Sequence, residues 1–440
     1  MKLLHYIFML TLAVGVNAQN SISGNFSPAN SFKWLMVYRL DTNGAQYITD
    51  TAVKDGHFSL TLPSSVSPGI YRLVYAVPQD EYYIDLIYNC EEDIVLNFDL
   101  KSGLQLVSSV ENKLFIEYFS DIDEAGDRLM DFYSTGESNV QKYMQLVNNL
   151  KQIQDKYESD SEGTIASHFV KANRHYLPQG FLPLNEYLIK KKNHFFDEIN
   201  FKNTTLQASE FLADKILNYL FWAVPPGTTE RKELVHEINK NADFLASKLQ
   251  AVPEPLQVSI WSKAWKKANE NKVYEVSDYI FNNYLKNLAL KEGNENLISN
   301  IETKTRLRIG AVSPEITWEE DGMPKSLTGL DGASNYLIIF WSSTCSHCLN
   351  ELPGLYEKLK NVKSLQVVAV GLEDNAENWK KTIPILAGFH HAIALEKWDS
   401  KYVKTFDIHQ TPSYYILDND KRIVARPENS EDVIDYLSAK

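Results

Sequence analysis

The stretch "FWSSTCSHCLNELP", residues 340–353, places two of the chain's three cysteines three positions apart. The apolar run "SNYLIIFW" at its beginning predicts a buried strand. The residues that follow predict a helix beginning around Cys345, because Leu352, Leu355 and Leu359 recur at helical spacing. The first cysteine of the pair is therefore expected where a strand turns into a helix.

A cysteine at the start of a helix is well placed to act as a nucleophile. Backbone N–H groups lack partners there, and the positive end of the helix dipole lies close by. Both effects favour the thiolate, and such positions lower cysteine pKa values to about 3.5–7.5. Cys348, one turn further on, is placed to attack a mixed disulfide and release the product. A protonated His347 would further favour the thiolate.

Two other uses of a cysteine pair fit the sequence less well. Zinc needs about four ligands, commonly from two such pairs, and the third cysteine, Cys90, is distant in sequence. Haem attachment places histidine after the second cysteine, where Leu349 stands. Reversible disulfide chemistry is therefore favoured, with no metal or cofactor. For Cys90, between two apolar runs, we predict a small buried residue at a strand end.

The composition limits the possible partners. The chain has 440 residues and a formal net charge of −13, which argues against nucleic acid, since phosphate binding needs clustered lysine and arginine. The first residues, with Lys2, an apolar run from Leu3 to Gly15 and Ala18, predict a secretory signal (1–18) cleaved after Ala18. The run is too short to span a bilayer, and no other stretch approaches the required length. We therefore predict an exported protein, periplasmic or extracellular, that does not span the membrane.

Three segments follow the signal. Residues 19–103 hold short aromatic and β-branched runs separated by turn signals, which predict an antiparallel β-sandwich. Residues 104–305 carry apolar residues at three- and four-residue steps, typical of amphipathic helices. In residues 306–440 strands such as "LQVVAVGL" and "SYYILD" alternate with helices, which predicts an α/β domain. We expect Ser430 to cap its last helix.

The last segment resembles the TlpA/ResA-like family of exported thiol–disulfide oxidoreductases, which have a thioredoxin fold. Trp341, Cys345 and Cys348 match the family's W-x-x-x-C-x-x-C pattern. Glu351 and Pro353 match the extension C-x-x-C-x-x-E-x-P.

The resemblance extends to Thr411 and Pro412 before "SYYILD", which resemble the family's cis-proline loop facing the cysteines. Three features depart from relatives. Thr344 stands where many relatives have an aromatic residue or proline, Ile339 replaces the buried aspartate of classical thioredoxins, and the dipeptide Ser346-His347 shares its histidine with the strongly oxidising DsbA type. The segment before residue 100 resembles the β-domains that precede thioredoxin domains in exported Bacteroidetes proteins.

The resemblance implies dithiol–disulfide exchange with protein thiols or disulfides, and a membrane-bound electron donor or acceptor. Cys345 and Cys348 would form the redox-active disulfide, with Cys345 attacking and Cys348 resolving. Glu351 would assist the proton of Cys348, and Pro412 would shape the substrate groove. The alternative is a binding or assembly protein, in which the first 300 residues do the main work and the disulfide is static.

Overall fold

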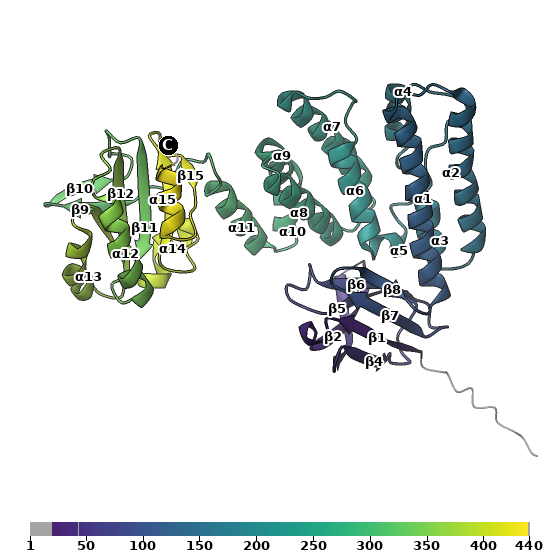
Figure 1. Ribbon diagram of the computed structural model, residues 1–440, viewed down its shortest axis with the longest axis horizontal. Coiled ribbons are helices and arrows are strands. Elements are labelled where there is room, and N and C mark those ends of the chain that lie inside the picture. Colours follow the sequence, from purple (N-terminus) through teal and green to yellow (C-terminus); the bar gives the residue numbers. More distant parts are fainter. Residues whose placement is uncertain (1–19, 43, 439–440) are drawn as a thin grey trace, which may run out of the picture. The chain divides into compact units, whose positions relative to one another are not determined.

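The chain divides into two compact units, with the boundary in the sequence between Glu292 and Gly293. The computed structural model describes residues 20–42 and 44–438, so the predicted signal segment lies outside the described residues. The predicted fold class is confirmed: β-sheets come first, helices follow, and an α/β domain ends the chain (Figure 1). The predicted boundary at residue 306 differs from the packing, because α11 (Glu295–Arg306) belongs to the second unit.

Two four-stranded sheets open the first unit and enclose one apolar core. Their orders are β4-β1-β7-β8 and β3-β2-β5-β6. All pairs are antiparallel except β1 with β7, which is parallel. In β4 buried and exposed residues alternate, because successive side chains of a strand point to opposite faces. The strands are β1 (Ser21–Ser27), β2 (Trp34–Asp41), β3 (Gly44–Ala52), β4 (His57–Thr61), β5 (Gly69–Val74), β6 (Tyr83–Tyr88), β7 (Ile94–Asp99) and β8 (Gly103–Leu106).

Helices make up the rest of the first unit. Side-chain caps fix the start of the two longest, since Ser109 and Asn139 accept backbone N–H groups of the first turn. The helices are α1 (Val110–Ser134), α2 (Val140–Asp160), α3 (Ala166–Ala172), α4 (Leu184–Asn193), α5 (Thr204–Gln207), α6 (Glu210–Trp222), α7 (Arg231–Leu249), α8 (Glu254–Glu270), α9 (Tyr274–Ile280), a π-helical turn (Phe281–Leu285) and α10 (Lys286–Lys291). None of the described helices is both long and apolar enough to cross a bilayer.

One buried amide joins the sheets to the helices. Asn112 of α1 accepts a hydrogen bond from the backbone N–H of Ile87 at 2.8 Å and donates to its carbonyl at 2.7 Å. Ile87 belongs to β6, which is an edge strand of its sheet. The Asn112 side chain therefore pairs with this edge as a neighbouring strand would.

The second unit is built on a mixed sheet of order β13-β12-β11-β14-β15. The strands β13, β12 and β11 are mutually parallel, and β14 runs antiparallel to β11. The last strand, β15, is antiparallel to β14 and so has the direction of the first three. A separate hairpin, β9 with β10, precedes the sheet. The elements are β9 (Thr317–Glu320), β10 (Met323–Ser326), β11 (Asn335–Trp341), α12 (Ser346–Leu359), β12 (Leu365–Glu373), α13 (Ala376–Thr382), β13 (His390–Leu395), α14 (Lys401–Phe406), β14 (Ser413–Asp418), β15 (Ile423–Ala425) and α15 (Ser430–Ser438). One short 3-10 turn follows α13 and another precedes α14.

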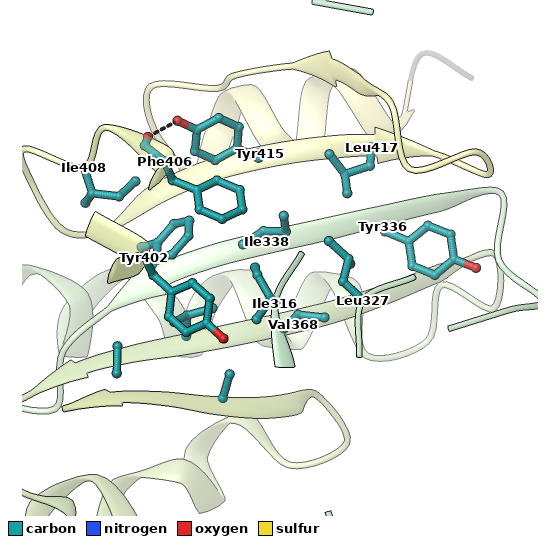
Figure 2. Packing of buried hydrophobic residues seen from close by; sticks show 14 of the residues in the cluster. Ile316, Leu327, Tyr336, Ile338, Val368, Tyr402, Phe406, Ile408, Tyr415 and Leu417 are labelled. Carbon is teal, nitrogen blue, oxygen red and sulfur yellow. Dashed lines mark hydrogen bonds between the residues drawn. The ribbon is translucent and has the colours of Figure 1, made fainter. Parts of the chain in front are cut away.

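The central strand β11 is buried along its whole length and packs on both faces. Tyr336 and Ile338 contribute to a core shared with α14 and β14 (Figure 2). On that side the Tyr415 hydroxyl donates to the carbonyl of Phe406 at 2.5 Å. The alternate residues, including Trp341, pack against α12 and α15 on the other face. Packing on both faces therefore holds the end of β11 in place, and the cysteine loop begins at this end.

The helix cap predicted at Ser430 is wrong by one residue. The Asn429 side chain accepts the N–H groups of Glu431 and Asp432, so Asn429 is the cap and Ser430 is the first helical residue. The N–H of Ser430 donates instead to Glu351 at 2.7 Å. This contact ties the start of α15 to the site described next.

Candidate active site

Cys345 occupies the N-cap of α12, directly after the loop that leaves β11. Its Sγ accepts the backbone N–H of Cys348 at 3.2 Å. Burial by itself raises the pKa of Cys345, but contacts with Cys348 and Thr411 and backbone N–H groups of Cys348 and His347 outweigh it. The net pKa lies below that of an ordinary thiol, as expected for sulfur at a helix start.

Cys348 has the opposite environment. Its side chain is fully buried in the core between the sheet and α12. Burial, followed by the hydrogen bond with Cys345, raises the pKa of the Cys348 thiol to about 12. Both cysteines are free thiols in the structure. The pair thus contains one partly exposed sulfur that ionises readily and one buried sulfur that holds its proton.

Thr411 and Pro412 lie opposite the cysteines. Their peptide bond is cis, which agrees with the resemblance to the cis-proline loop. The carbonyl oxygen of Thr411 lies 3.5 Å from the Sγ of Cys345 and accepts from that thiol. Pro412 is buried, whereas Thr411 is partly exposed beside the sulfur. A sulfur-bearing chain that approaches Cys345 would therefore meet the backbone of this loop.

Glu351 lies one turn beyond Cys348, and its carboxylate has three partners. Oε1 accepts from the Tyr414 hydroxyl at 2.8 Å and from the Ser430 N–H at 2.7 Å. Oε2 lies 3.0 Å from Nε2 of His347. Burial, followed by the hydrogen bond to Glu351, raises the pKa of Tyr414, and a charge on Cys348 would raise it further. Tyr414 is therefore a protonated donor near both groups, and the sequence argument did not find it.

His347 lies differently from the sequence expectation. Its side chain is 73% exposed and directed to Glu351. Its backbone N–H is among the groups that lower the pKa of Cys345. Its imidazole charge would be shared with Glu351, so its effect on the Cys345 thiolate stays a prediction.

Substitutions at His347 separate the backbone from the imidazole. We expect His347→Pro to raise the pKa of Cys345 and lower the reduction potential by roughly 30 mV, which corresponds to about 1.4 kcal/mol, because proline removes the N–H. Proline is tolerated in a first helical turn. His347→Gln keeps the N–H and should shift the potential by less than half as much. Redox titration of both variants checks this; a larger shift in the glutamine variant would mean that the imidazole dominates.

Trp341 is fully buried beside Cys348. Its indole Nε1 is buried without a hydrogen-bond partner among the described residues. The side chain therefore contributes apolar packing under the pair.

A carboxylate that the sequence argument missed anchors the cysteine loop. Glu373, the last residue of β12, is 2% exposed. It accepts from the backbone N–H of Ser343 at 2.5 Å and from the Ser343 hydroxyl at 2.9 Å. The strands β11 and β12 are parallel, so their carboxyl ends share one sheet edge. Glu373 therefore fixes the backbone two residues before Cys345.

Removing this anchor is expected to destabilise the second unit. In Glu373→Ala the Ser343 N–H stays buried without an acceptor, which costs about 1–3 kcal/mol of unfolding free energy. Glu373→Gln retains an acceptor oxygen and should lose less. The matched control is Asp374→Ala, whose side chain is 72% exposed and should change stability by less than about 0.5 kcal/mol. Denaturant unfolding of the three variants is the measurement, and equal losses at 373 and 374 would refute the anchor.

Cys90 lies away from this pair, in the first unit. It follows β6 with φ 63° and packs against the sandwich core, with its Sγ 3.8 Å from the carbonyl of Val66. It is partly exposed rather than buried as predicted, because it sits in the turn after the strand. Among the described residues no three His, Cys, Asp or Glu side chains gather as metal ligands.

This fold and this pair of thiols define a thioredoxin-like protein. Residues 334–423 match the family model described as thioredoxin-like. The C-terminal domain is thioredoxin-like, and the predicted TlpA-like class is confirmed at this family level. A comparison with curated proteins found no match.

Three of the solved structures that are similar to the chain come from Bacteroidetes. A domain of a possible thiol-disulfide isomerase from Cytophaga hutchinsonii is 31% identical over 30% of this chain and 92% of that one, with a TM-score of 0.27. A thiol:disulfide interchange protein from a Bacteroides species is 27% identical over 30% and 90%, with a TM-score of 0.27. A thioredoxin-like protein from Bacteroides caccae is 17% identical over 60% and 96%, with a TM-score of 0.32. The assignment to the family rests on the family model and on the site.

Proposed function

We propose that the protein is an exported thiol–disulfide oxidoreductase that exchanges the Cys345–Cys348 dithiol with disulfides of other proteins. The observation that carries the proposal is the asymmetry of the pair. Cys345 is partly exposed at a helix start with a lowered pKa, and Cys348 is buried with a pKa of about 12. Such an asymmetry suits one attacking and one resolving sulfur.

In the reducing direction the Cys345 thiolate attacks one sulfur of a substrate disulfide. The substrate S–S bond breaks, a mixed disulfide forms, and the other substrate sulfur leaves as a thiolate. Cys348 then loses its proton and attacks the Sγ of Cys345, which releases the second substrate thiolate. Two electrons have passed from the pair to the substrate, and the reverse sequence oxidises a substrate dithiol.

Two further groups are assigned roles in this proposal. Glu351, on the same helix as Cys348, takes the proton that Cys348 must lose, with Tyr414 and the Ser430 N–H holding its carboxylate in place. Pro412 and the Thr411 carbonyl form the wall along which the substrate chain lies. A membrane-bound partner then restores the starting redox state, and the signal segment 1–18 is removed on export.

Redox titration tests the proposal against the alternative of a static disulfide. Catalytic pairs titrate between about −120 and −270 mV, whereas structural disulfides lie below about −300 mV. A partly exposed Cys345 predicts a value in the catalytic range. A midpoint reduction potential below −300 mV would instead favour the hypothesis of a binding or assembly protein.

The redox activity is expected to reside in the second unit. A fragment of residues 293–440 should reduce insulin disulfides with dithiothreitol present, at a rate within about threefold of the full chain. A fragment of residues 20–292, which retains Cys90 alone, should give the rate of dithiothreitol by itself. Turbidity of precipitating insulin measures both, and activity in the full chain only would show that the first unit takes part.

A further inference from the structure

A cavity in the helical part of the first unit is lined by apolar and basic residues, whereas the chain as a whole is acidic. It has a volume of about 340 Å³ and lies along α4 and α6, both labelled in Figure 1. That size is at the lower end of the range for small-molecule sites, about 300–1,000 Å³. Its walls are formed by Leu188, Lys191, Lys192, Phe195, Asn218, Tyr219, Trp222, Ala223 and Val224.

The charged residues that line the cavity are all basic. Two lysines line the cavity, and none of its described lining residues is Asp or Glu. The protein as a whole carries a formal net charge of −13. Partly buried cations are costly unless an opposite charge compensates them. The cavity wall therefore places two cationic side chains beside an apolar surface.

The ion pair that Lys192 forms is a long one. Lys192 lies 3.9 Å from Glu237, but Glu237 makes its shorter contact, 2.7 Å, with Lys240. The ammonium of Lys192 also lies 6.0 Å from the ring centre of Tyr219, a wall of the cavity. Burial lowers the pKa of Lys192, and the same cause acts on Lys191.

Lys191 has charged neighbours of both signs. Asp123 and Asp127 attract it from outside the cavity wall. Lys215, whose pKa burial lowers to about 8, opposes them. The ammonium of Lys215 lies 5.5 Å from the ring centre of Phe195, another wall residue. An anion in the cavity would be attracted by Lys191, Lys192 and Lys215 and repelled by the two aspartates, but only Lys191 and Lys192 of these groups line the cavity.

A buried amide occupies carbonyl groups at the end of α6, beside the cavity. Carbonyl groups at a helix C-terminus repel negative charge when they are free. Here the buried amide of Asn241 donates to the carbonyls of Tyr219, Leu220 and Ala223 at 3.0–3.3 Å. Trp222 at the same end is 75% exposed, so a large apolar ring stands at the cavity without protein covering it.

We propose that this cavity binds a small amphiphilic carboxylate, with its aliphatic chain along Phe195, Tyr219 and Trp222 and its head group at Lys191 and Lys192. The site is independent of the cysteine pair. Charge-assisted contacts supply the preference for an anion, and the apolar wall supplies the preference for an acyl chain. The ligand class is therefore a medium-chain monocarboxylate.

Calorimetric titration of the full chain with octanoate and with octan-1-ol tests the proposal. The two probes have the same chain length and differ in charge. We expect octanoate to bind at least about tenfold more tightly than octan-1-ol. The double variant Lys191→Met and Lys192→Met keeps the apolar stems and should lose at least about tenfold in affinity for octanoate, with octan-1-ol unchanged.

The matched control is Lys190→Met on the same helix. Lys190 pairs with Glu186 at 3.8 Å and does not line the cavity, so its variant should bind octanoate like the parent chain. Trp222→Ala should weaken both probes. Equal affinity for the two probes, no binding of octanoate, or an equal loss in the Lys190 control would each overturn the proposal. Thermal unfolding of the variants checks that all are folded.

Discussion

A chain with Cys348→Ala is expected to stop after the first chemical step and keep its substrate. Treated in reduced form with glutathione disulfide, it should hold one glutathione as a mixed disulfide on Cys345, because no second thiol is placed to release it. The parent chain should release two glutathione thiols and finish with the Cys345–Cys348 disulfide. Mass spectrometry of the intact chain distinguishes the two products directly.

The control for this result is Cys90→Ala, since Cys90 lies in the other unit and should not affect either product. Cys345→Ala should form no stable adduct and should reduce insulin no faster than dithiothreitol alone. An adduct on Cys348 in that variant, or a parent chain that also stops at the adduct, would reverse the assigned roles.

Alkylation should separate the two cysteines by a wide margin. At pH 7 a pKa of about 12 leaves Cys348 with a thiolate fraction at least about a thousandfold below that of Cys345, because the pKa of Cys345 lies under the usual 9.0. A thiolate of lower pKa is a weaker nucleophile, which offsets about half of this difference on a logarithmic scale. A rate ratio of at least about thirtyfold should remain, and the burial of Cys348 adds to it.

The measurement is the rate of iodoacetamide labelling of the reduced chain, resolved by peptide mapping between pH 5 and 9. Labelling of Cys345 should decline only below its lowered pKa, because protonation removes the thiolate. The Cys348→Ala variant shows whether the rate at Cys345 is independent of its neighbour. Similar labelling rates at both sulfurs would refute the asymmetry on which the proposed function rests.

Much of the second unit could be predicted because its signals are local. The buried run around β11, the leucine spacing of α12 and the position of Cys345 at the helix start all depend on residues close in sequence. The strand β13 has a weaker local signal, since "HHAIAL" lacks a long apolar run and begins with two histidines. Its pairing with β12 supplies the stability that the local pattern does not show.

The partners of the site residues could not be predicted in the same way. Glu351 is held by Tyr414 and Ser430, which lie 63 and 79 positions away in the sequence. Such contacts depend on tertiary packing, which spacing does not reveal. Glu373 had a usable signal, because an acidic residue directly ends a buried parallel strand next to the strand that leads to the cysteines. In open α/β sheets that edge is where functional groups gather.

The contact between Asn112 and Ile87 decides how the first unit can be divided. An exposed edge strand pairs readily with other chains. A sandwich fragment that stopped at residue 103 would lose α1 and uncover the backbone of β6, so it should self-associate. Recombination could therefore transfer the sandwich to another protein only together with α1, the helix that covers its edge.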